Sequence, residues 1–260
     1  MKIIIDTVLK DDNVTSITAS SEDANFPVTN LRDDFTTNLW KAAAGTSATI
    51  TLQVSKGSSV ELMNTNATAV VVTAGSGDSY SLEAGYSLES GYSVADDEVA
   101  TIPVYDPDGV EGRFWADYSV FTEPHIVTII LTAPTAPSAG IVRAGNVEEF
   151  EDPSPGSKEG SIDFSIEKET NNGADYYRKR KVINTYDNLQ IIETRANAWK
   201  FKHDIFDAVG PMPLAIRMVQ SSNVTDHEFV TFAKRLEPPH VEPFFTPTHS
   251  RITFSLREVI

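Results

Sequence analysis

The chain contains no cysteine, which excludes disulfide bonds, thiolate metal sites and cysteine nucleophiles. It also lacks any apolar run approaching the roughly 18–20 residues that a helix needs to cross a bilayer, so we expect no membrane insertion. The opening sequence MKIIID has a single lysine and too short an apolar run for a secretory signal, and it is typical of a first β-strand. These absences leave the cellular compartment open.

Patterns typical of a catalytic centre are also lacking. The serines have no G-x-S-x-G or S-x-x-K context that would indicate an activated hydroxyl. The histidines form no HxH, HExxH or comparable spacing for metal ligation; they are His125, His203, His227, His240 and His249. We therefore expect the protein not to be an enzyme.

Acidic side chains are concentrated in the first part of the chain. Residues 1–150 hold 21 acidic and 7 basic side chains, whereas residues 151–260 hold 16 and 14, so the net charge of −16 falls almost entirely on the first part. Such a surface repels phosphate backbones, and we expect no nucleic-acid binding. The excess is typical of a solvated surface, and it would also suit a cationic partner or bound Ca²⁺.

Short β-branched or alternating runs, separated by clusters of Gly, Ser, Asn, Asp and Pro, fill the first part of the chain. This cadence predicts an antiparallel β-sandwich. The repeat YSLEAG, YSLESG, YSV over residues 80–94 predicts a hairpin or a lobe of that sandwich, and residues 106–111 favour a β-turn over a partial calcium loop. The predicted strands are residues 2–5, 48–54, 59–63, 69–73, 126–132 and 140–144.

The segment of residues 151–160, which contains DPSPGSKEG, is rich in Pro, Gly, Ser and charge and predicts a linker. After it, residues 161–168 alternate strictly, with Ile162, Phe164 and Ile166 on one face. Asn171, Asn172 and Gly173 indicate a turn, and residues 176–186 would return as the partner strand of a hairpin. Residues 214–219, 228–235 and 251–259 predict further strands, which gives an α+β arrangement with a helix on one sheet face.

That helix is predicted within residues 185–219. Apolar residues recur there at spacings of three and four, which places them on one helical face; they are Leu189, Ile192, Ala196, Trp199, His203 and Phe206. Asn188 or Asp187 would cap the start, and Gly210 followed by Pro211 would end the helix. On this reading His203 is a packed core residue.

One dense basic run, Arg178, Lys179, Arg180 and Lys181, lies on the predicted return strand. Alternate residues of a strand point to opposite faces, so no single face receives all four side chains. The run is typical of a solvated strand that protects a sheet edge. The functional alternative is an interface that docks against an acidic neighbour, which could be the acidic part of another copy.

Two stretches resemble known families. The sequence ANFPVTNLRDD at residues 24–34, leading to Leu39 and Trp40, resembles the opening of galactose-binding-like (discoidin or F5/8 type C) β-sandwiches, and residues 126–131 and 140–145 are similar to their closing strands. The resemblance implies such a sandwich over residues 1–150, with residues 1–6 able to pair with a second domain. It also implies a structural calcium ion near Asp33, Asp34 and Thr37, although the family commonly has Asp-Gly where this chain has two aspartates.

The second resemblance covers residues 161–260. The sequences VGP at 209–211, FAKRL at 232–236 and ITFSLREV at 252–259 look like the tail-tube-derived domain of bacteriophage distal tail and minor tail proteins. This implies a structural virion protein at the phage tail tip or baseplate, made in the host cytoplasm, that forms a hexameric ring. Its partners would be further copies of itself, the tube, hub and fibre proteins, and a host surface glycan. The alternative is a lectin-like module that binds carbohydrate with the sandwich loops.

Overall fold

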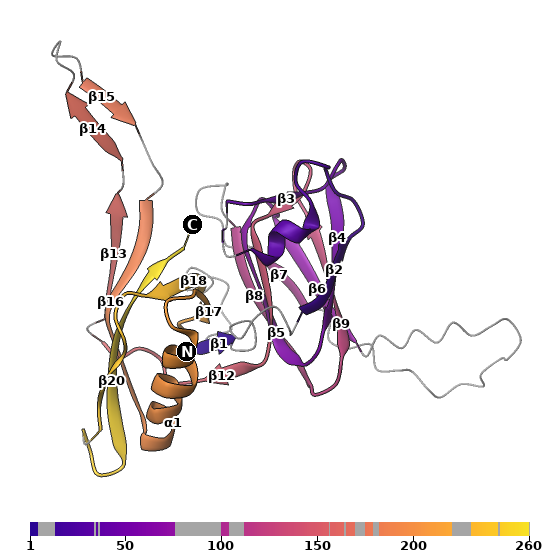
Figure 1. Ribbon diagram of the computed structural model, residues 1–260. Helices are drawn as coiled ribbons and strands as arrows, with labels where there is room; N and C mark the ends of the chain where they lie inside the picture. Colours follow the sequence, from indigo (N-terminus) through magenta and orange to yellow (C-terminus); the bar gives the residue numbers. More distant parts are fainter. Residues whose placement is uncertain are drawn as a thin grey trace, which may run out of the picture. The chain divides into compact units, whose positions relative to one another are not determined.

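The computed structural model describes residues 1–4, 14–33, 35, 37–75, 100–103, 112–155, 157–163, 165–169, 175–178, 182–219, 230–243 and 245–259 (Figure 1). These residues form mainly β structure with one α-helix, and every strand pair of known register is antiparallel, so the mainly β class is confirmed. The chain divides into two compact units. Unit 1 comprises Met1–Ile3, Glu149–Gln220 and Thr231–Ile260, and unit 2 comprises Ile4–Glu148 and Ser221–Val230.

Unit 2 is a β-sandwich, as the sequence predicts. A five-stranded sheet in the order β2-β4-β9-β6-β7 and a three-stranded sheet in the order β11-β5-β8 enclose one hydrophobic core, and β10 pairs with β3 beside them. The strands are β2 (Val14–Ala19), β3 (Trp40–Lys41), β4 (Ser47–Val54), β5 (Gly57–Thr65), β6 (Ala69–Gly75), β7 (Ala100–Pro103), β8 (Gly112–Phe121), β9 (His125–Thr132), β10 (Ser138–Ala139) and β11 (Ile141–Gly145).

Alternation along these strands explains the core. Every second residue of β4, including Ile50 and Leu52, is fully buried, and the residues between them are more exposed. Because side chains of a strand point alternately to its two faces, each strand contributes one apolar face to the core. The predictions for β4, β5, β6, β9 and β11 are confirmed within two residues. The repeat at residues 80–94 and the turn at residues 106–111 lie outside the described residues.

A close backbone approach at the start of β5 requires a glycine. A Cβ atom built on Gly57 would lie 2.8 Å from the carbonyl carbon of Gly145 and 2.9 Å from its Cα. These are backbone atoms, which cannot rotate away as a side chain can. We expect Gly57→Ala to lower the free energy of unfolding by roughly 1–3 kcal/mol through overpacking, measured by urea denaturation.

Gly45 in the same unit is the control for this substitution. It has a φ of +89°, but a Cβ there would meet only the Ser47 carbonyl oxygen, at 3.8 Å. Gly45→Ala should therefore cost only backbone strain, about 1 kcal/mol. An alanine at Gly57 that unfolds at the wild-type urea concentration would contradict the expected clash.

Unit 1 contains most of an eight-stranded sheet in the order β12-β1-β17-β18-β20-β16-β13, with β19 paired to β20. The predicted strand at residues 2–5 is confirmed as β1. Residues 158–160 of the predicted linker belong to β13. The strands are β1 (Lys2–Ile4), β12 (Val147–Glu149), β13 (Lys158–Asp163), β16 (Val182–Thr194), β17 (Leu214–Arg217), β18 (Val230–Arg235), β19 (His240–Glu242) and β20 (His249–Glu258).

Strand β16 corrects the predicted start of the helix. Residues 182–194 are extended and, from Thr185 onward, pair with β20, with a register shift between Tyr186 and Leu189. Asn188 lies in this bulge with a φ of 53° and caps no helix. Leu189 and Ile191 bury their side chains at the spacing of a strand. Pairing with β20, which lies 55 to 72 residues away in the sequence, overrides the local helical spacing, and sequence periodicity alone cannot reveal this pairing.

The helix begins with α1 (Arg195–Trp199) and continues as the π-helical turn η2 (Lys200–Asp207). Thr194 caps it, because its Oγ1 accepts a hydrogen bond from the Asn197 N–H at 3.3 Å. The predicted end is confirmed: Gly210 has a φ of +67°, and its N–H donates to the Phe206 carbonyl at 3.1 Å.

The buried face of the helix differs from the predicted one. Its buried residues are Ala198, Phe201, Ile205, Phe206 and Val209. Trp199 is 67% exposed, and the imidazole of His203 is partly exposed and lies 3.0 Å from the Asp207 carboxylate, so the prediction of a core His203 is wrong. A π-helical turn takes more residues than an α-turn, which changes the residues that share a face. The Lys202 ammonium, which donates to Asp207, holds the pKa of that carboxyl below its ordinary value.

Candidate functional site

The predicted hairpin is confirmed as two successive strand pairs in unit 1. β13 pairs with the first half of β16, from Lys158 opposite Asp187 to Asp163 opposite Val182. β14 (Ile166–Glu169) pairs with β15 (Asp175–Arg178). Figure 1 shows β14 and β15 continuing from the ends of β13 and β16 that lie away from α1. We call residues 158–187 the arm.

The arm exposes apolar side chains to solvent. Ile162 on β13 is 36% exposed and Val182 on β16 is 42% exposed. Five of the six residues of β13 are exposed, and β13 is the last strand of its sheet. A two-stranded ribbon with little burial is at best marginally stable alone, and an edge strand presents unpaired N–H and C=O groups to a partner. These exposed side chains and the free edge of β13 make the arm suited to contact another chain.

The predicted basic interface belongs to this arm by sequence. Arg178 ends β15, whereas its side chain and all of Lys179, Arg180 and Lys181 lie outside the described residues. The turn at residues 171–173 and the side chains of Phe164 and Ile166 lie outside them as well. The interface assigned to the basic run stays a prediction.

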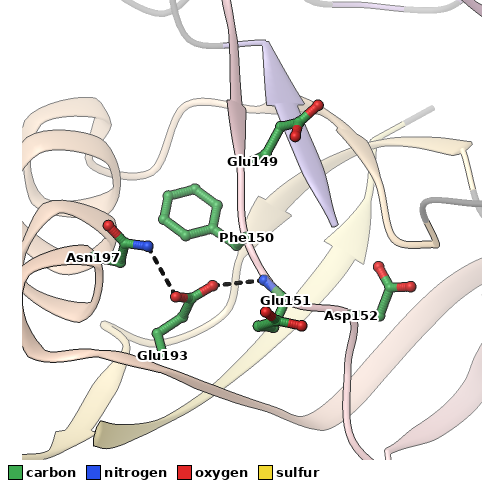
Figure 2. Close-up of a pocket in the computed structure, with 6 residues that line it drawn as sticks. All are labelled: Glu149, Phe150, Glu151, Asp152, Glu193 and Asn197. Carbon is green, nitrogen blue, oxygen red and sulfur yellow. Dashed lines mark hydrogen bonds between the residues drawn. The ribbon is translucent and has the colours of Figure 1, made fainter. Parts of the chain in front are cut away.

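A small polar pocket lies elsewhere in unit 1 (Figure 2). The Glu193 side chain is buried there, and its Oε1 accepts the Glu151 N–H at 2.6 Å while its Oε2 accepts the Asn197 amide at 3.0 Å. Beside it, the Phe150 ring packs edge-on against Phe201, with centroids 5.0 Å apart. Glu193 thus links the segment before β13 to the start of the helix through its two carboxylate oxygens. Its role is structural. The pocket is lined by Glu149, Phe150, Glu151, Asp152, Glu193 and Asn197.

The described part of the chain offers neither a metal cluster nor a membrane-spanning helix. Within it, no three or more His, Asp or Glu side chains gather as they would around a metal ion. No helix among the same residues is long and apolar enough to cross a membrane.

The predicted calcium loop follows the short 3₁₀ helix η1 (Val28–Arg32) in unit 2. Asp33 ends η1, and its Oδ2 accepts the Asn38 amide at 2.9 Å. Thr37 is exposed, and Asp34 lies outside the described residues. The Asp33 carbonyl accepts a hydrogen bond from the Arg143 guanidinium, so a cationic group already occupies one side of this loop. The calcium ligand set stays a prediction, and the arginine beside it is a feature that the sequence did not reveal.

Comparisons with known proteins add little to this picture. No family model matches the sequence, and no curated protein matches it. Reduced XRCC1, solved bound to the catalytic domain of DNA polymerase β, is similar in structure with a TM-score of 0.37 and 20% identity, over 56% of this chain and 99% of that chain. Chitosan-binding module 1 of a chitosanase/glucanase from Paenibacillus sp. IK-5 has a TM-score of 0.34 and 21% identity, over 53% of this chain and 96% of that chain. Likeness at this level carries no argument about function.

Proposed function

We propose that this chain is a structural virion protein of a tailed phage, a ring-forming adaptor at the distal tail or baseplate. Residues 161–260 would build the ring, residues 1–150 would form a galactose-binding-like sandwich, and residues 151–160 would join them. The adaptor connects the tail tube to hub, fibre or receptor-binding components and has no enzymatic role. The resemblance of residues 161–260 to tail-tube-derived domains motivates this proposal.

The observation that carries the proposal is the exposed arm. Ile162 on the edge strand β13 and Val182 on β16 point to opposite faces of this strand pair, and a neighbouring copy that packed against these faces would cover them. Head-to-tail contacts of this kind generate closed rings when the rotation between copies closes. The basic run at residues 178–181 would then meet the acidic residues 1–150 of the next copy, which favours correct docking over random association.

The direct experiment uses the purified full-length chain. We expect light scattering to give a mass of about six times 28.5 kDa, and negative-stain electron microscopy to show rings. Virions carrying labelled protein should show the label at the tail tip. A chain that stays monomeric across the accessible concentration range would contradict the proposal.

A carbohydrate-binding module is the second candidate function. Phe26 and Phe35, which precede and follow η1, are 39% and 58% exposed. Exposed aromatic rings in sandwich loops are suited to contact a flat apolar sugar face, as in pockets where aromatic side chains supply the contact area. Binding of the monomer to a glycan array, lost on Phe35→Ala, would favour this function over the ring.

A further inference from the structure

Arg143, in the middle of β11, carries a buried charge in unit 2. The residue is 7% exposed. Its Nη2 donates to the Asp33 carbonyl at 3.0 Å, and its Nη1 donates to the Leu31 carbonyl at 3.4 Å and the Val142 carbonyl at 3.0 Å. The guanidinium thus fastens the end of η1 to a strand that lies 110 residues away in the sequence.

An acidic residue lies beside this arginine in the sheet. The antiparallel register of β11 and β5 places Arg143 directly opposite Glu61, and directly opposite residues of such a pair share one face of the sheet. Glu61 is fully buried. A buried carboxylate favours a positive charge nearby, and Arg143 and Glu61 lie on the same face of this strand pair.

We propose that the Arg143 guanidinium supplies the positive charge at the loop that follows η1, in the place where a structural calcium ion would otherwise bind. The unit then folds without calcium. The proposal is independent of whether the protein forms rings or binds sugar.

The chemistry of the two cations explains why they exclude each other here. Ca²⁺ takes about six to eight oxygen ligands at roughly 2.3–2.6 Å and depends on carboxylates and carbonyls directed at it. At this loop the carbonyls of Leu31 and Asp33 are directed at N–H groups, and Asp33 Oδ2 accepts an amide N–H. A guanidinium is always charged and presents several donors in a fixed plane, which suits several carbonyls at once. A calcium ion at the same oxygens would also face the repulsion of the arginine.

The test measures thermal unfolding of the full-length chain in EDTA and in millimolar calcium, together with isothermal titration of calcium into the EDTA-treated protein. Wild-type protein should melt at the same temperature in both and give no saturable heat. Arg143→Met should melt about 5–15 °C lower, because the carbonyls of Leu31, Asp33 and Val142 lose their buried hydrogen-bond donor. Arg143→Lys, which keeps the charge but loses the planar fork, should fall between the two.

Lys41→Met, which removes one exposed positive charge from the same unit, is the matched control and should melt like wild type. A wild-type melting temperature that rises in calcium, or saturable calcium binding, would overturn the proposal. So would Arg143→Met that melts like the Lys41→Met control. If Arg143→Met does not fold, the wild-type titration and Arg143→Lys still decide the question.

Discussion

Replacing Phe201 with alanine is expected to lower the free energy of unfolding by about 3–5 kcal/mol, the cost of removing a large ring from a packed core. The Phe201 ring is fully buried. Its centroid lies 4.7 Å from that of Phe206 and 5.0 Å from those of Phe150 and Phe254. One substitution therefore loosens the contacts among the helix, strand β20 and the segment after β12. Urea denaturation followed by circular dichroism at the helical wavelength would measure the loss.

Trp199→Ala is the matched control, because Trp199 lies two residues earlier on the same helix and is 67% exposed. Its ring contacts His203, with centroids 4.0 Å apart, and truncation should cost less than about 1 kcal/mol. The sequence periodicity predicts the opposite order, with Trp199 in the core. Equal losses from the two substitutions would show that the buried face is not the one described.

Shortening the arm is expected to abolish ring formation while unit 1 stays folded. Asp163 and Val182 are opposite each other in the antiparallel register, so an Asn-Gly turn can replace residues 164–181 and close the ribbon as a tight hairpin. The variant loses β14, β15 and the basic run but keeps the strand pairs β13–β16 and β16–β20. Light scattering should give the mass of a monomer. The temperature at which the helical circular dichroism signal is lost should stay near that of wild type.

A charge reversal separates the contribution of the basic run to assembly from that of the strands of the arm. Arg178→Glu combined with Arg180→Glu keeps the strands and reverses part of the basic run. If the run docks on an acidic neighbour, this variant should assemble more weakly, and the more so at low salt, where exposed charges are least screened. Assembly that is unchanged in this variant would remove the basic run from the interface, and rings formed by the shortened variant would remove the arm as well.

The fold was predictable where neighbours in sequence determine the structure. Alternation over a few residues was enough to locate β4, β9 and β20, because each of these strands buries one face and exposes the other. β8 was missed, because Arg113 and Asp117 interrupt its apolar residues although Phe114 and Tyr118 face the core. The predicted helix began too early, because the apolar spacing of three and four residues continues through residues that form β16.

The sites were predictable only in part. The dense basic run at residues 178–181 can be read directly from the sequence, and it belongs to the hairpin that forms the arm. The exposure of Ile162 and Val182 was not visible, because alternation indicates which residues share a face and cannot show whether the rest of the chain covers that face. The role of Arg143 depends on the carbonyls of Leu31 and Asp33, and no local pattern connects residues so far apart.

The bulge at Asn188 lies near the point where strand β16 separates from β20 and continues into the arm. Beyond it toward the arm, β16 keeps contact with β20 only at Thr185 and Tyr186 and continues with β13 alone. Residues gained or lost past Asp163 and Val182 would move the tip by about 3.3 Å for each pair and leave the helix and its aromatic neighbours in place. In the proposed ring, such changes would alter the distance that each copy can span.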